Sequence, residues 1–98
     1  MKPGDTPPKN SLKLKEPPPP LVLPPFDAPA KRSVTIEGHR TSVSLEEAFW
    51  KALGQQARSL GRARAALIAE IDHARPPNVG LATALRLFIL SSLQNRPD

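Results

Sequence analysis

Cysteine is absent from the sequence, and aromatic residues make up only 4% of it. The lack of cysteine excludes disulfides and thiolate metal sites, and it fits a reducing compartment. So few aromatic side chains make a single core across all 98 residues unexpected. Long apolar runs are missing too: no segment approaches the roughly 20 residues of a membrane span, and no apolar stretch follows Met1 as in a signal peptide. We therefore expect a soluble protein of the cytoplasm.

The residue combinations that catalysis or metal binding requires are also missing. The sequence contains no glycine-rich phosphate loop, no nucleophile motif and no paired acid and base. Glu70 and Asp72 are two residues apart on a predicted helix, so they face different ways. His39 and His73 stand without companion ligands. We expect no enzyme activity, no metal, no cofactor and no small-molecule substrate.

The charge of the chain is strongly positive. Fourteen lysines and arginines face nine acidic residues, which gives a formal net charge of +5 and a sequence pI of about 10.3. This balance suits a polyanionic partner such as nucleic acid. Charge alone does not separate a nucleic-acid-binding protein from other small basic proteins.

Prolines divide the chain into two parts. Ten of the 13 prolines lie in residues 1–30, in segments such as EPPPPLVLPP. Each proline fixes φ and removes a backbone donor, so this stretch is predicted to be a disordered or polyproline II tail. We expect a solvated tail; its lysines could also hold DNA loosely, and its prolines could bind a partner. Residues 31–95 are predicted to form the folded domain.

Two short segments after the tail alternate polar and β-branched apolar residues. Residues 33–36 alternate first, residues 37–39 are predicted to turn, and residues 41–45 alternate again. Side chains of a strand point alternately to its two faces. The second segment therefore has an apolar face and a polar face, formed respectively by Thr41, Val43 and Leu45 and by Arg40, Ser42 and Ser44.

Three helices are predicted over residues 46–60, 62–74 and 79–94. The first has an apolar stripe that includes Phe49 and Leu53, and the second has Leu67, Ile68 and Ile71. The third is apolar nearly all round, which predicts burial on more than one side.

Residues at the helix ends predict how each helix begins and stops. Ser44–Glu47 fits a capping box for the first helix, and Gly61 is predicted to end it in a left-handed conformation. Pro76 and Pro77 stop the second helix, and Asn78 is the predicted N-cap of the third.

A five-residue strand with one apolar face needs a partner for its backbone groups. Residues 34–36 could pair with it, but an edge would remain beside a basic polar face. Pairing the same strand from two copies about a twofold axis would complete a ribbon whose apolar side four helices can cover. The other side would present polar side chains, and a two-stranded ribbon fits the major groove of DNA.

The segment RTSVSLEEAFWKAL, followed by SLG and LIAEID, resembles the ribbon-helix-helix family of bacterial repressors. The longer string KRSVTIEGHRTSVSLEEAFWKAL…ALIAEIDHARPPN…ALRLFIL resembles a short bacterial subfamily with an added third helix. The resemblance covers residues 31–93. It implies a mostly helical fold with one or two short strands, in which two copies share an intermolecular antiparallel β-ribbon.

The resemblance also implies roles for individual residues. The base-reading side chains fall on Arg40, Ser42 and Ser44, and a phosphate clamp at the start of the second helix falls on Arg62, Ala63, Arg64 and Ala65. Ala63 and Ala65 replace polar residues that family members often carry, so the two arginines would have to compensate. Lys31 and Arg32 are candidate phosphate contacts from an arm before the strand. The dimer core is predicted to comprise Thr41, Val43, Leu45, Phe49, Leu53, Leu67, Ile68 and Ile71.

The sequence therefore predicts a protein that binds specific sequences of double-stranded DNA and acts as a transcriptional repressor. It would function in the bacterial cytoplasm, at the nucleoid, as a homodimer, with a tetramer as the larger alternative. Two other functions remain open. One is an antitoxin-type regulator, although the tail precedes the domain. The other is a protein-interaction scaffold that uses the apolar third helix and does not bind DNA.

Overall fold

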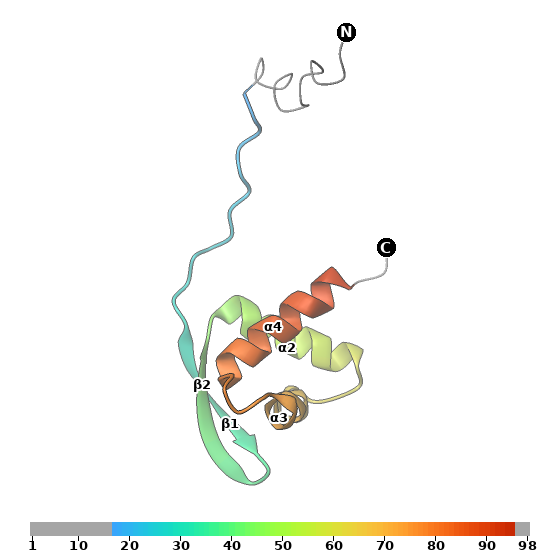
Figure 1. Ribbon diagram of the computed structural model, residues 1–98. Helices are drawn as coiled ribbons and strands as arrows, with labels where there is room; N and C mark the ends of the chain where they lie inside the picture. The colour runs from blue at the N-terminus through green and yellow to red at the C-terminus, as the bar shows by residue number, and fades with distance from the viewer. Residues whose placement is uncertain (1–16, 96–98) are drawn as a thin grey trace, which may run out of the picture.

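The computed structural model describes residues 17–95 and shows a β-hairpin followed by three helices (Figure 1). The strands are β1 (Ala30–Ile36) and β2 (His39–Leu45). The helices are α2 (Glu47–Ser59), α3 (Arg64–Ala74) and α4 (Leu81–Gln94). The predicted fold class, a two-stranded ribbon with two helices and an added third one, is confirmed.

The ribbon is formed within one chain. β1 and β2 pair antiparallel, from Ala30 opposite Leu45 to Ile36 opposite His39. Glu37 and Gly38 make the turn with φ of 50° and 81°, and positive φ at both positions is typical of the tight type I′ hairpin turn. The pairing of the two alternating segments, which the sequence left open, is therefore observed within the chain, and pairing with a second copy stays a prediction. β2 pairs with its own β1, because this turn brings the two alternating segments together.

The helices begin one or two residues later than predicted. Glu46 is the N-cap of α2 and makes no side-chain capping bond, so the predicted capping box is wrong. Ser44 still belongs to β2, which extends to Leu45. α4 begins after Gly80, again without a side-chain cap, so Asn78 is not its N-cap. A bond from the Val79 amide to the Pro76 carbonyl (3.1 Å) forms a turn there instead.

A single apolar core lies between the inner face of the hairpin and the three helices. α3 packs against β1 and α4 against β2, and all three helices contact one another. The buried residues are Val34, Val43, Leu45, Leu53, Ala57, Leu67, Ile68, Leu85 and Ile89. Leu85 and Ile89 show that α4 contributes directly to this core. The structure thus covers the apolar face of the hairpin with helices of the same chain.

Most of the residues predicted to form a dimer core are buried inside this single chain. Val43, Leu45, Leu53, Leu67 and Ile68 are buried, and Phe49 and Ile71 pack against them while partly exposed. Thr41 is exposed. The core of one chain therefore contains most of the apolar residues for which the sequence suggested a second copy.

Residues 17–29 lead into β1 as an extended segment without helix or strand (Figure 1). The predicted tail of residues 1–30 therefore ends where β1 begins, and its first sixteen residues lie outside the described part. Within residues 17–95, no helix combines the length and apolar character needed to cross a membrane.

Candidate nucleic-acid interface

The face of the hairpin that points away from the helices is polar and basic. Three cross-strand pairs form it, and all six of their side chains are exposed: Lys31 with Ser44, Ser33 with Ser42, and Thr35 with Arg40. We call this set the outer face. Neither strand places an acidic side chain on it. The outer face therefore combines two cations with four hydroxyl groups, side chains that can bond to base edges and phosphate oxygens.

The structure brings the three predicted reading residues onto this one surface. Arg40, Ser42 and Ser44 lie on alternate positions of β2. Ser33 and Thr35, which are not among the predicted reading residues, lie beside them on β1. Their signal was the alternation of residues 33–36, which matches that of β2. Only the register of the hairpin shows that the two alternating faces coincide.

Lys31 and Arg32 are both part of β1 and point to opposite faces, so they do not form an arm before the strand. Lys31 belongs to the outer face. Arg32 is turned inward, and its Nη2 lies 2.6 Å from Oε1 of Glu47. Its Cζ also lies 5.4 Å from the ring centre of Trp50. Arg32 therefore links β1 to α2, and the structure does not support its predicted contact with phosphate.

The predicted phosphate clamp lies where α3 begins. Ala63 is the N-cap of α3 and makes no side-chain capping bond, so neither Ala63 nor Ala65 supplies a polar side chain there. The backbone amides of a helix's first turn lack partners within the helix and carry its positive dipole end. The start of α3 therefore offers backbone donors, and its contact with phosphate stays a prediction.

The two arginines of the predicted clamp have different surroundings. Arg62 forms an ion pair with Glu70 and donates from Nη1 to the carbonyl of Leu60 (3.3 Å). Arg64 lies with its Cζ 4.4 Å from the ring centre of Trp50. Arg62 is therefore already paired within the chain, whereas the guanidinium of Arg64 packs on an aromatic ring.

Arg86 fixes the end of β2 next to the outer face. It is the only charged residue of α4. Its Nη2 lies 2.9 Å from Oε1 of Glu46 and 3.5 Å from the carbonyl oxygen of Ser44, to which it donates. A backbone hydrogen bond, with a further contribution from Arg86, lowers the pKa of Glu46. This contact attaches α4 to the junction between β2 and α2, a role that the sequence did not indicate.

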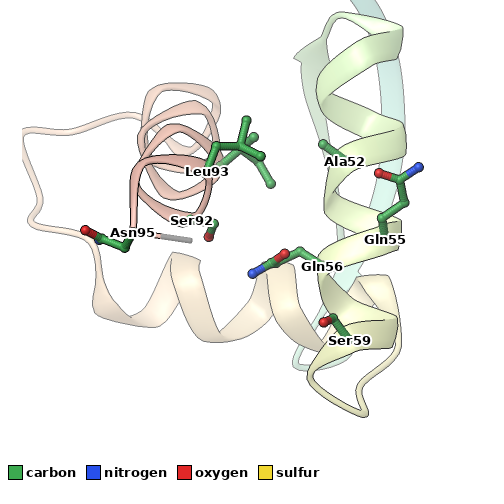
Figure 2. Close-up of a pocket in the computed structure, with 8 residues that line it drawn as sticks. Ala52, Gln55, Gln56, Ser59, Ser92, Leu93 and Asn95 are labelled. Atoms are coloured by element: carbon green, nitrogen blue, oxygen red, sulfur yellow. The ribbon is translucent and has the colours of Figure 1, made fainter. Parts of the chain in front are cut away.

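A hollow of about 610 Å³ lies between α2 and α4 (Figure 2). Its lining is formed by Ala52, Gln55, Gln56, Ser59, Ile89, Ser92, Leu93 and Asn95. None of these side chains is charged, so the hollow offers amides and hydroxyls and no acid–base pair. Among residues 17–95, no three histidines or carboxylates are grouped so that they could hold a metal ion.

Comparison with known proteins adds one finding. The family model described as "Ribbon-helix-helix domain" matches residues 29–93, a range that includes both strands, α2, α3 and most of α4. Searches of curated proteins and of solved structures found no match. Ribbon-helix-helix domains commonly bind DNA as transcription regulators, typically as dimers, and the family is not one of enzymes. With its hairpin, its helices and a match over about two-thirds of its length, the chain belongs to the ribbon-helix-helix family.

Proposed function

We propose that this protein is a transcriptional repressor that binds specific sequences of double-stranded DNA through the outer face of its hairpin. The observation that supports this proposal most directly is the composition of the outer face, which has two cations, four hydroxyls and no acidic side chain within the strands. A two-stranded ribbon has the width that the major groove admits. The net charge of +5 supports a polyanionic partner. Occupying an operator would then be sufficient to repress transcription.

Arg40 is the principal candidate for reading a base. Its side chain is exposed, and it forms no ion pair with residues 17–95. An unpaired guanidinium can donate two parallel bonds to O6 and N7 of guanine. Ser42 and Ser44 have shorter side chains whose hydroxyls can donate or accept hydrogen bonds with several bases. They can therefore add base contacts but discriminate less between sequences than Arg40. Ser44 is available for this role because α2 has no side-chain cap.

The proposal includes a homodimer in which the free edges of two β2 strands pair. In an antiparallel ladder, every second residue directs its backbone groups away from its partner strand. Counting from Ile36 and His39, which close the two-residue turn, Ser42 and Ser44 are such residues of β2. Arg86 donates a hydrogen bond to the carbonyl of Ser44, which agrees with a Ser44 backbone that points away from β1. Pairing two such edges puts the two β2 strands side by side at the centre of a four-stranded sheet. These two strands form the two-stranded ribbon that the groove admits, and they present Arg40, Ser42 and Ser44 twice, as a palindromic operator requires.

Selection of bound duplexes from a random pool, followed by substitution of Arg40, tests this proposal. We expect Arg40→Ala to lower the affinity for the selected site by about 1–3 kcal/mol per contact and to relax discrimination at one position of each half-site. Arg58→Ala is the matched control, since Arg58 is also exposed, lies at the end of α2 and forms no ion pair among the described residues. Equal losses of DNA affinity in Arg40→Ala and Arg58→Ala would contradict the proposal, as would a selection that enriches no DNA sequence.

A protein-interaction scaffold is the second candidate, and one observation favours it. Leu87, Leu90 and Leu93 on α4 are 56%, 49% and 57% exposed, and apolar side chains at this spacing share one side of a helix. Such a side can bind another protein without DNA. A titration with DNA at several salt concentrations separates the two candidates. The affinity of a DNA-binding protein falls steeply with salt, whereas a scaffold would show no such dependence.

A further inference from the structure

Among the half-buried arginines of residues 17–95, Arg64 alone forms no ion pair with the described residues. Four arginines in this range are half-buried. Three of them form ion pairs: Arg32 with Glu47, Arg75 with Asp72, and Arg86 with Glu46. Arg64 forms neither an ion pair nor a side-chain hydrogen bond with the described residues. Its Nε is buried without a partner, as is the Nε of Arg32, but Arg32 has its Nη2 paired with Glu47. A partly desolvated cation is normally paired, so its isolation requires an explanation.

Two residues of α2 hold the guanidinium of Arg64 in place. Trp50 provides a ring face, with Cζ of Arg64 at 4.4 Å from its centre. Gly54, one turn further along α2, provides the space. A Cβ built on Gly54 would lie 3.1 Å from Cζ and 3.2 Å from Nε of Arg64, and it would overlap Nη2. Glycine weakens the interior of a helix, and here its lack of a side chain admits the arginine.

Nearby carboxylates do not neutralise this cation. The first turn of α3, which Arg64 begins, contains no acidic residue. Glu47, one turn from Trp50, is already paired with Arg32 and Lys51. The positive end of the α3 dipole adds to the charge of Arg64. An anion from outside the chain would find there a fixed guanidinium whose Nη groups are without partners in residues 17–95.

We propose that Trp50 and Gly54 are positioning residues that hold Arg64 to bind a phosphate of the DNA backbone. This inference rests on the proposed DNA binding. The family resemblance already implies a phosphate contact at the start of α3, and the inference assigns the positioning of that contact to Trp50 and Gly54. Stacking on Trp50 orders the guanidinium before DNA binds, which reduces the entropy lost on binding. The contact carries no sequence information, because a phosphate is present at every position.

Gly54→Ala tests the positioning without removing the arginine. We expect its Cβ to displace the guanidinium and to weaken binding to duplexes of every sequence by a similar factor. The slope of log K against log salt should fall by about 0.9 per contact, or about 1.8 per dimer. The probe is a fluorescently labelled duplex of mixed sequence, titrated at several salt concentrations with the full chain. Gly80→Ala is the matched control, since nothing lies within 4 Å of its added Cβ.

Further variants distinguish positioning from general stability. Arg64→Gln should give the same change of slope, and the double variant Gly54→Ala/Arg64→Gln should lose nothing more. Trp50→Phe keeps an aromatic face and should retain most of the slope, whereas Trp50→Leu should not. Circular dichroism melts of every variant establish that the domain is folded at the temperature of the titration.

The results separate failure of this inference from failure of the proposed function. Suppose that Arg40→Ala weakens binding but the Gly54 and Arg64 variants keep the wild-type slope. DNA binding then stands, and the placement of Arg64 is structural only. A loss of dimer mass in Arg64→Gln, measured by light scattering, would instead show that Arg64 is needed for the dimer interface and would overturn the phosphate contact. If the wild type does not bind the duplex, both proposals are wrong.

Discussion

At the scale of single residues, Gly61 determines how α2 ends and where α3 begins. Its φ is 73°, a left-handed conformation that glycine adopts without steric cost. Two backbone hydrogen bonds end the helix here: the Gly61 amide donates to the Arg58 carbonyl (3.0 Å), and the Arg62 amide donates to the Ala57 carbonyl (2.8 Å). This is the Schellman arrangement of a helix end. It reverses the chain so that α3 and the guanidinium of Arg64 can return to α2.

Gly61→Ala is therefore expected to destabilise the fold by about 1–2 kcal/mol, the cost of a side chain in the left-handed region. A Cβ at this position would meet nothing within 4 Å, so the cost arises from the backbone alone. Urea unfolding followed by circular dichroism measures it. Gly61→Asn serves as the control, because asparagine adopts the left-handed conformation more readily than alanine, and we expect it to lose less stability than Gly61→Ala. Equal stabilities of the two variants would refute this account of Gly61.

The left-handed role of Gly61 could be predicted from the sequence, whereas the direction of Arg32 could not. A glycine after an amphipathic stretch is a local signal, and local geometry decides its conformation. The direction of Arg32 depends on how far β1 extends toward the N-terminus. Once β1 is known to begin at Ala30, period two places Arg32 beside Val34 on the inner face. Its pairing with Glu47 and Trp50 is a tertiary contact that no local pattern encodes.

At the scale of elements, the alternation of the two segments predicted strands but did not determine their partners. Either segment could have paired with its neighbour or with a second copy, since both choices satisfy the backbone. The turn pairs β2 with β1 along one edge and leaves the other edge of β2 free. Glu37 in this turn adopts a positive φ, which is uncommon for a residue other than glycine, asparagine or aspartate. The helix boundaries were predicted to within two residues. The N-caps were not, because strand length and the turn before α4 move the starts of the helices.

The free edge of β2 makes a matched pair of substitutions possible. Ser33 and Ser42 lie opposite each other, and both direct their amides away from the hairpin. Ser42→Pro removes an amide from the edge proposed to form the dimer, and Ser33→Pro removes one from the opposite edge. Neither change removes a hydrogen bond within the hairpin.

We expect Ser42→Pro to weaken dimerisation by about 2 kcal/mol or more, since symmetry removes two bonds of about 1 kcal/mol each. Ser33→Pro should leave the dimer intact. Sedimentation equilibrium over a range of protein concentrations measures both. A dimer equally strong in the two variants would show that β2 edges do not form the interface.

At the scale of the whole molecule, the apolar core lies within a single chain. From the sequence, pairing of two copies was expected to complete the ribbon and to cover its apolar side with four helices. The hairpin pairs β2 internally, and Leu85 and Ile89 of α4 complete the core. Dimer formation can then serve DNA binding, by doubling the outer face, without being needed to bury the apolar side of the hairpin.

The contribution of residues 1–29 to stability and to DNA binding can be measured by deleting them. We expect a variant that begins at Ala30 to unfold with the same free energy within about 0.5 kcal/mol, as is usual for changes away from the core. The large apolar side chains of residues 17–29 contribute little to the fold, because Leu21, Val22, Leu23 and Phe26 are 61–98% exposed. The loss of DNA affinity should be small, since residues 1–29 contain four lysines against three acidic residues. Urea unfolding and a salt titration with DNA measure the two quantities. A marked loss of stability would show that the tail packs on the domain, and a salt slope reduced by more than about one would place part of the phosphate-binding surface in the tail.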